Sequence, residues 1–164
     1  IAFPLGQTTL EDKLSETRNA IKNGADEIDY VVNLTKLKAG DTAYIESEMA
    51  RITDICREFS VVSKVIFENC YLTEDEKKTL CHIATKVKPD FIKTSTGFGT
   101  GGATFEDVAL MKRETEGSGV KIKAAGGIRT LKTALEMIDL GVSRIGSTSS
   151  VAIMEEYMAH SPLL

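Results

Sequence analysis

Two lysines lie at matching positions near the ends of two apolar segments of the chain. Lys93 belongs to residues 91–97, Lys123 belongs to residues 121–129, and each segment opens into glycine after its lysine. A buried ammonium ion costs several kcal/mol, so such a lysine either reaches solvent at the strand end or has a chemical role. Like charges held close together lower each other's pKa. The pair could therefore supply a neutral amine near pH 7, which can attack a carbonyl and form a Schiff base.

Other charged residues fall on the same expected strand faces as the two lysines. Side chains alternate along a strand, which places Asp29 inward on its own strand and Lys64 together with Glu68 on another. At an effective dielectric near 20, two charges about 5 Å apart repel by about 3 kcal/mol, or about two pKa units. One lysine would be neutral, the other charged, and Asp29 with a bound water could relay protons. The alternative is a satisfied network of buried ion pairs, and Asp29 alone could simply cap a turn.

Glycine-rich turns after the late strands could bind an anion. Main-chain N–H groups and the positive end of a following helix favour phosphate, and serine hydroxyls can add donors. Arg129 could bind phosphate or pair with a surface acid, and both interpretations stay open. The loop over residues 97–102 could fold over a ligand. The predicted substrate- and phosphate-binding residues are Thr96, Gly97, Gly126, Gly127, Arg129, Gly146, Ser147 and Ser149.

The elements that must position these residues alternate along the chain. β-Branched and apolar runs predict strands over residues 25–33, 61–69, 91–96, 120–125 and 142–147. Helices are expected between them, with caps at Thr8, Asp41, Thr73, Thr104, Thr130 and Ser149. This alternation is typical of βα units in a parallel sheet, either doubly wound or closed into a barrel. No G-x-G-x-x-G follows the first strand, and glycines follow two late strands, so we predict a (β/α)₈ TIM barrel.

The strand count predicts that the barrel is incomplete. Residues 1–6 read as the end of one strand, and about five βα units follow it. A full barrel of this class has about 250 residues, whereas the chain has 164. We therefore expect about 60 residues, or two βα units, to be missing before Ile1, and a single partial barrel domain over residues 1–164.

Composition excludes several classes of protein. The net charge is −4 without a basic cluster, which argues against a nucleic-acid partner. No apolar run approaches the length that spans a bilayer, so we expect no membrane partner. Three cysteines without a C-x-x-C motif indicate reduced thiols and a cytoplasmic location. No histidine or acid cluster has metal-ligand spacing, and we predict neither a metal nor another cofactor.

The lysine motifs resemble those of the deoxyribose-phosphate aldolase family. The resemblance covers essentially the whole chain, except that family members carry two further βα units at the front. It is carried by Glu27-Ile28-Asp29, Lys64-Val65-Ile66, residues 91–97, residues 123–130, Ile145-Gly146-Ser147-Thr148-Ser149 and the opening Phe3-Pro4-Leu5-Gly6.

The resemblance implies a class I aldolase that needs no metal and cleaves 2-deoxy-D-ribose 5-phosphate to acetaldehyde and D-glyceraldehyde 3-phosphate. It implies that Lys93 forms the Schiff base, that Lys123 perturbs it, and that Asp29 relays protons, with Lys64 and Glu68 in support. We expect a phosphosugar as the small-molecule partner and a homo-oligomer, a dimer or tetramer. The alternatives are an inactive barrel fragment that binds phosphosugar or completes an assembly, and a Schiff-base aldolase for another phosphosugar.

Overall fold

The centre of the fold is one five-stranded parallel sheet in which each strand pairs with the next along the chain. The computed structural model describes residues 1–160, so the last four residues of the predicted domain lie outside the described part. The strand order is β1-β2-β3-β4-β5. A doubly wound sheet would reverse its order at a switch point, whereas a consecutive order is that of a barrel wall. The strands are β1 (Glu27–Val31), β2 (Val62–Ile66), β3 (Phe91–Lys93), β4 (Lys121–Ala125) and β5 (Arg144–Gly146).

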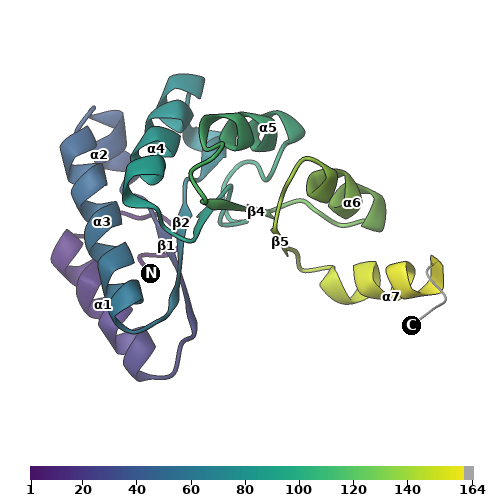
Figure 1. The fold of residues 1–164 in the computed structure, drawn as a ribbon, viewed down its shortest axis with the longest axis horizontal. Helices are drawn as coiled ribbons and strands as arrows, with labels where there is room; N and C mark the ends of the chain where they lie inside the picture. Colours follow the sequence, from purple (N-terminus) through teal and green to yellow (C-terminus); the bar gives the residue numbers. More distant parts are fainter. Residues whose placement is uncertain (161–164) are drawn as a thin grey trace.

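Helices follow the strands and cover the outer side of the sheet (Figure 1). Helix α1 packs against α3, α3 against α4, α4 against α5, and α6 against α7. No helix of residues 1–160 is long and apolar enough to cross a membrane. The helices are α1 (Leu10–Lys22), α2 (Leu34–Lys38), α3 (Thr42–Glu58), α4 (Glu74–Val87), α5 (Phe105–Glu114), α6 (Leu131–Asp139) and α7 (Ser150–His160), with a short 3₁₀ turn, η1 (Asn69–Tyr71), after β2.

Side-chain hydroxyls and carboxylates begin most of these helices, as predicted. Thr73 forms a complete capping box with Glu76 at the start of α4. The capping box predicted at Thr8 is wrong by one residue, because Thr9 is the cap and accepts from the N–H of Asp12. Helix α2 was not predicted, since its five residues are too few to show a helical period.

The sheet separates an apolar outer layer from a charged inner layer. Ile28, Tyr30, Val65, Ile92 and Ile122 belong to the buried core between the strands and the helices. The residues that alternate with them point to the concave side of the sheet, as period-two alternation requires. The strand faces were therefore predicted correctly, although the strands are shorter than expected.

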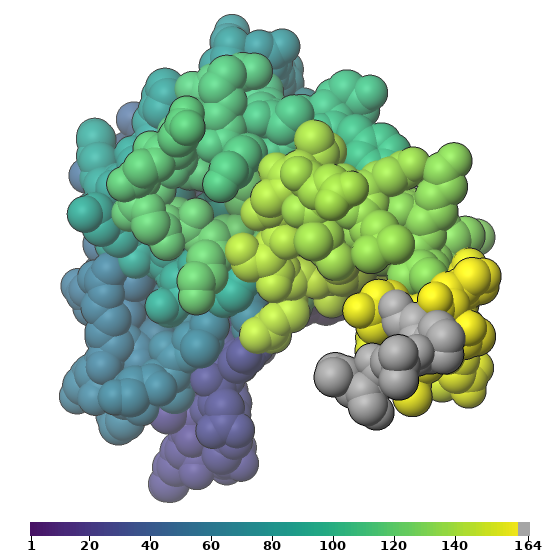
Figure 2. All heavy atoms as spheres, turned by 45° about the vertical axis from the view of Figure 1, so that its right-hand side comes forward, coloured from purple at the N-terminus to yellow at the C-terminus, as the bar shows by residue number. Residues whose placement is uncertain are grey.

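Residues at the start of the chain extend the sheet beyond β1. The Ile1 amino group donates to the Asp29 carbonyl at 2.7 Å, and Val31 N–H donates to the Ile1 carbonyl at 3.2 Å. Bonds on both sides of one residue are the pattern of a parallel pair. The fold is therefore a partial TIM barrel of five βα units preceded by the end of one strand, and its concave side is open between the N-terminal and C-terminal segments (Figure 2).

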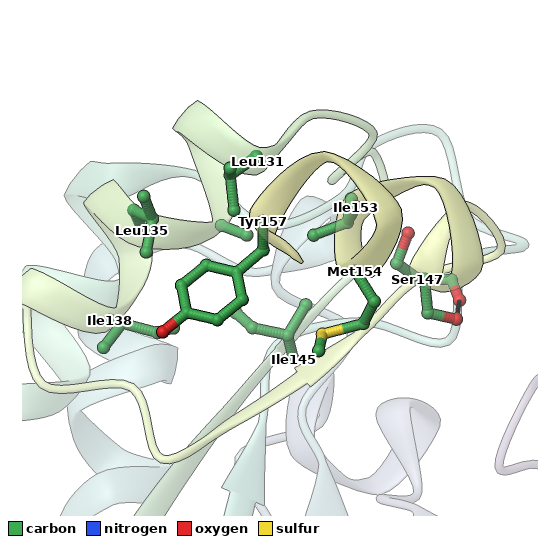
Figure 3. A pocket seen from close by; sticks show the side chains of 10 residues that line it. Leu131, Leu135, Ile138, Ile145, Ser147, Ile153, Met154 and Tyr157 are labelled. Carbon is green, nitrogen blue, oxygen red and sulfur yellow. Dashed lines mark hydrogen bonds between the residues drawn. The ribbon is translucent and has the colours of Figure 1, made fainter. Parts of the chain in front are cut away.

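Two predicted helix faces differ from the structure. In α5 the apolar spacing predicts Val108, Ala109 and Met111 inward, but Ala109 is exposed and Leu110 is buried. In α6 it predicts an inward stripe of Leu131, Leu135 and Ile138, but the buried residues are Ala134 and Met137, because that stripe faces α7 rather than the sheet. This stripe and α7 enclose an apolar groove of about 420 Å³ (Figure 3), lined by Leu131, Leu135, Ile138, Ile145, Ile153, Met154 and Tyr157 among others.

Candidate active site

One carboxylate on the concave side of the sheet binds three lysines. Asp29 Oδ1 lies 2.7 Å from Lys64 Nζ. Asp29 Oδ2 lies 2.8 Å from Lys93 Nζ and 2.7 Å from Lys123 Nζ. Residues from β1, β2, β3 and β4 thus meet at a single acid. The predicted convergence of these four residues is what the structure shows.

The register of the strands explains this convergence. Asp29 lies directly opposite Lys64, and Lys93 lies directly opposite Lys123. Neighbouring strands are about 4.8 Å apart, so β4 lies about 14 Å from β1 along the sheet. The Lys123 and Asp29 side chains meet only because the sheet curves inward, as a barrel wall does, which brings their ends much closer together than a flat sheet would. The local contact therefore depends on the global curvature.

Burial and hydrogen bonding oppose each other at this acid. Burial would raise the pKa of Asp29, but hydrogen bonds from Lys123, Lys64 and Lys93 together hold it below its ordinary value. Burial lowers the pKa of Lys123, and the nearby charge of Lys93 lowers it further, whereas Asp29 raises it. Asp29 is consequently ionised at neutral pH, and Lys123 loses its proton more easily than a lysine in water. An ionised carboxylate in contact with several lysine amines is an arrangement suited to amine chemistry.

Hydrogen bonds on both sides fix the end of β3 that carries Lys93. Phe67 N–H donates to the Lys93 carbonyl at 2.9 Å, and Thr94 N–H donates to the Lys123 carbonyl at 3.1 Å. The buried Thr94 hydroxyl donates to the Ala125 carbonyl and accepts from the Ala125 N–H, both at 3.1 Å. Thr94 therefore joins the two lysine-bearing strands where β3 ends. Sequence reasoning included Thr94 in the motif but assigned it no role.

Glu68 does not belong to the lysine cluster, contrary to the prediction. Strand β2 ends at Ile66, and Glu68 has a left-handed backbone with φ of 56°, which breaks the alternation that predicted an inward side chain. Its buried carboxylate accepts from the Thr96 N–H at 3.0 Å and from the Thr96 hydroxyl. The Thr96 hydroxyl in turn accepts from the Phe98 N–H at 3.0 Å. Glu68 therefore holds the loop that follows β3.

Both lysines open into a cavity of about 280 Å³ at the C-terminal ends of the strands. In barrel enzymes this end of the sheet carries the active site. The cavity brings together most of the residues predicted to bind substrate. Its lining consists of Lys93, Thr96, Gly97, Lys123, Ala125, Gly126, Gly127, Ile128, Arg129, Gly146, Ser147 and Thr148.

The turn after β4 presents unpaired donors to this cavity. The N–H groups of Gly127 and Ile128 make no hydrogen bond within residues 1–160. A Cβ on Gly126 would lie 2.9 Å from Gly102 Cα, so the glycines let the 97–102 loop pack against this turn. Paired free N–H groups beside a glycine turn are suited to a phosphate.

The remaining predicted phosphate residues differ in their placement. The Ser147 hydroxyl donates to the Ile128 carbonyl at 2.5 Å and accepts from the Ser149 N–H at 2.9 Å, so it joins the two turns. Ser149 does not line the cavity. Arg129 is exposed, lines the cavity and has no ion pair with another residue of the described chain. The first N–H of α6, at Leu131, lies 3.4 Å from the Glu156 carboxylate.

Two charged residues at the site were not predicted. Arg144 of β5 donates to Glu27 of β1 at 2.9 and 3.2 Å, across the concave side of the sheet. Glu27 also lies 2.7 Å from Lys64 Nζ. Strand alternation places Arg144 and Gly146 on one face, so the period-two pattern contained the signal. Within residues 1–160, no three His, Cys, Asp or Glu side chains are grouped so that they could hold a metal ion.

Comparison with known proteins agrees with this geometry. Residues 2–148 match the family model described as DeoC/LacD family aldolase. A deoxyribose-phosphate aldolase from Lactobacillus acidophilus is 59% identical over 155 residues, which cover 94% of this chain and 65% of the relative. The chain thus spans just under two thirds of that relative's length.

Solved structures show the same similarity. The structure titled "QR15, an Aldolase" is 41% identical, with a TM-score of 0.91 over 98% of this chain and 71% of that one. The tetrameric deoxyribose phosphate aldolase from Aeropyrum pernix is 30% identical, with a TM-score of 0.88 over 98% of this chain and 67% of that one. The strand order, the lysine-bearing strands and these matches lead to one assignment. The chain belongs to the DeoC/LacD aldolase family.

Proposed function

We propose that the chain carries the catalytic lysines of a class I aldolase that cleaves 2-deoxy-D-ribose 5-phosphate. The products are acetaldehyde and D-glyceraldehyde 3-phosphate. The observation that carries the proposal is the sharing of Asp29 Oδ2 by the Lys93 and Lys123 ammonium groups, beside a cavity with free main-chain donors. The curated relative from Lactobacillus acidophilus bears the name of this enzyme.

Lys93 is proposed to form the Schiff base. The two lysines have nearly equivalent contacts with Asp29, so the family motif, and not the geometry, assigns the nucleophile. The neutral amine of Lys93 adds to the C1 aldehyde of the open-chain sugar, and water leaves to give an iminium ion. The C2–C3 bond then breaks as the C3 hydroxyl loses its proton, and the bonding electrons form an enamine. Protonation of the enamine at C2 and addition of water release acetaldehyde and restore the amine.

Asp29 and Lys123 are proposed to support these proton transfers. Formation of the neutral amine removes one of the three cations that bind Asp29, which raises the affinity of this carboxylate for a proton. Asp29 can then accept a proton from a bound water or from the substrate hydroxyl. Lys123 keeps a positive charge beside the forming iminium and makes the protonated form of Lys93 less stable.

The phosphate is proposed to bind at the turns after β4 and β5. Gly127 and Ile128 offer free N–H groups, and Arg129 offers an exposed cation at the same cavity. Thr96, Gly97 and Gly146 complete the wall near the lysines. Ser147 must turn its hydroxyl away from the Ile128 carbonyl to donate to a phosphate, and Ser149 would contribute only through Ser147.

Turnover of the purified chain tests the proposal. The chain is incubated with 2-deoxyribose 5-phosphate, and acetaldehyde is measured with a coupled dehydrogenase. Lys93→Met should abolish acetaldehyde release, whereas Lys121→Met, an exposed lysine on the next strand, should preserve it. Ribose 5-phosphate and unphosphorylated 2-deoxyribose measure the contributions of C2 and of the phosphate. Binding of the phosphosugar without release of acetaldehyde would instead identify an inactive binding fragment.

The setting of this activity is part of the proposal. We propose a cytoplasmic enzyme of deoxyribonucleotide catabolism, in which the barrel segment over residues 1–164 acts as a single domain. Cys56, Cys70 and Cys81 are free, as in a reducing compartment. A homo-oligomer is proposed because the Aeropyrum pernix structure is described as tetrameric.

A further inference from the structure

A chain of charged contacts crosses the concave side of the sheet from β5 to Asp29. Arg144 Nη1 lies 2.9 Å from Glu27 Oε2, and Arg144 Nη2 lies 3.2 Å from Glu27 Oε1. Glu27 Oε2 lies 2.7 Å from Lys64 Nζ, which lies 2.7 Å from Asp29 Oδ1. Arg144 lies 117 positions after Glu27 in the sequence. Through Glu27 and Lys64 it is linked to Asp29, the acid that binds both candidate catalytic lysines.

Lys64 is the central member of this chain and is almost completely buried. Its side chain is 1% exposed, and it lies between two carboxylates, one on each side. A buried ammonium ion requires partners, and Asp29 alone would have to supply them if Glu27 were absent. Hydrogen bonds from Arg144 and Lys64 lower the pKa of Glu27 to about 2, so Glu27 is ionised across the neutral range.

The geometry divides the two oxygens of Asp29 between two tasks. Oδ1 accepts from Lys64, and Oδ2 accepts from Lys93 and Lys123. We propose that Glu27 and Arg144 are positioning residues that hold Lys64 on Oδ1 of Asp29, so that Oδ2 remains available to the catalytic pair. This inference depends on the proposed function only in taking Lys93 as the nucleophile.

The charged groups around Asp29 carry an excess of positive charge. Four cations face two acids here, namely Lys64, Lys93, Lys123 and Arg144 against Glu27 and Asp29. Lys121 lies over the Phe91 ring and adds positive charge nearby.

Removal of Glu27 and removal of Arg144 change the net charge near Lys93 in opposite directions. Glu27→Gln leaves Asp29 as the single acid among the contacting groups, which favours the neutral form of Lys93 and lowers its midpoint of titration. Arg144→Met removes one positive charge and leaves Lys64 as the remaining cation bound to Glu27. This change should raise the Lys93 midpoint by a smaller amount. The double variant should return toward the unmodified chain.

Reaction with pentane-2,4-dione measures this midpoint without turnover. The neutral lysine amine adds to one carbonyl, and water leaves to give an absorbing enaminone. The rate is followed against pH, and peptide mapping assigns the adduct to Lys93. For Glu27→Gln we expect the midpoint to fall by about half a pH unit, the size of effect that one added net charge has in a partly screened site.

Two controls separate positioning from a merely structural role. Arg51→Met breaks a pair of equal length, 2.9 Å to Glu11, on the outer surface, and it should leave the midpoint unchanged. Circular dichroism verifies the fold of each variant. A purely structural role would change the extent of labelling while the midpoint stayed the same for all variants.

The outcomes decide the proposal in each case. A lower midpoint for Glu27→Gln together with a higher one for Arg144→Met supports it, and an unchanged or lower midpoint for Arg144→Met counts against it. An unchanged or higher midpoint for Glu27→Gln overturns it, as do equal shifts in one direction for both variants. If Glu27→Gln does not fold, Arg144→Met decides alone, with a rise in support and no change or a fall against. Absence of turnover together with the expected shifts would reject the proposed function and retain this inference.

Discussion

Replacement of Asp29 by asparagine should separate imine formation from turnover. The substitution keeps the shape of the side chain but removes the charge that three lysines contact at 2.7–2.8 Å. The Asp29 side chain is 24% exposed, so an effective dielectric of about 40 is appropriate rather than the value for a dry interior. With charge centres about 4 Å apart, the attraction between Asp29 and each lysine ammonium group is about 2 kcal/mol.

Loss of the Asp29 charge should favour imine formation but slow turnover. Loss of the acid removes an attraction that stabilises the ammonium form of Lys93, so imine formation should persist and extend to lower pH. Loss of the proton relay should reduce turnover by about 10²- to 10⁴-fold. The assay traps the acetaldehyde imine with borohydride at a series of pH values and quantifies ethylated Lys93 by mass spectrometry. The reasoning is refuted if the adduct disappears together with turnover, or if its pH midpoint rises.

Three further predictions concern the scaffold. Lys13 and Glu48 form a fully buried pair at 2.7 Å, so Lys13→Met should lower the free energy of unfolding in urea by about 3–5 kcal/mol, and Lys13→Met/Glu48→Leu by less; equal losses would contradict this. Gly146→Ala places a Cβ 2.9 Å from Ala125 Cβ and 3.4 Å from Lys123 Cε, so these groups must shift, and turnover should fall at temperatures where the variant is still folded. Unaltered turnover would show that the Lys123 side chain has room to move. Glu27 titrates near pH 2 against an ordinary 4.5, so its contribution is complete above pH 4.5 and is lost toward pH 2. In Glu27→Gln the stability should therefore change less over this pH range, and an identical acid-unfolding profile would contradict the assignment.

The inward face of each strand was predictable because side chains alternate. Asp29, Lys64, Lys93 and Lys123 each occupy a position that the period of two assigns to the concave side, and the structure brings all four together. The βα alternation fitted a doubly wound sheet or a barrel, and the glycines after two late strands favoured the barrel, whose consecutive strand order the structure has. These features depend on local spacing, which the sequence contains.

The features that could not be predicted depend on where a strand ends or on how far the sheet curves. Glu68 was expected among the lysines because β2 was extended past Ile66, but a left-handed residue ends the alternation there. Strand alternation gives the inward face of Arg144, but its contact with Glu27 crosses from the last strand to the first and depends on how far the sheet curves. Leu135 faces α7 rather than the core because helix orientation is set by packing, not by periodicity alone.

The identity of the lysine that carries the substrate carbon tests the account most directly. The unmodified chain is incubated with acetaldehyde, reduced with borohydride, digested and mapped by mass spectrometry. The account predicts an ethyl group on Lys93, its loss in Lys93→Met, and no comparable label on Lys121. An adduct confined to Lys123, or equal labelling of all exposed lysines, would contradict the assignment of Lys93 as the nucleophile.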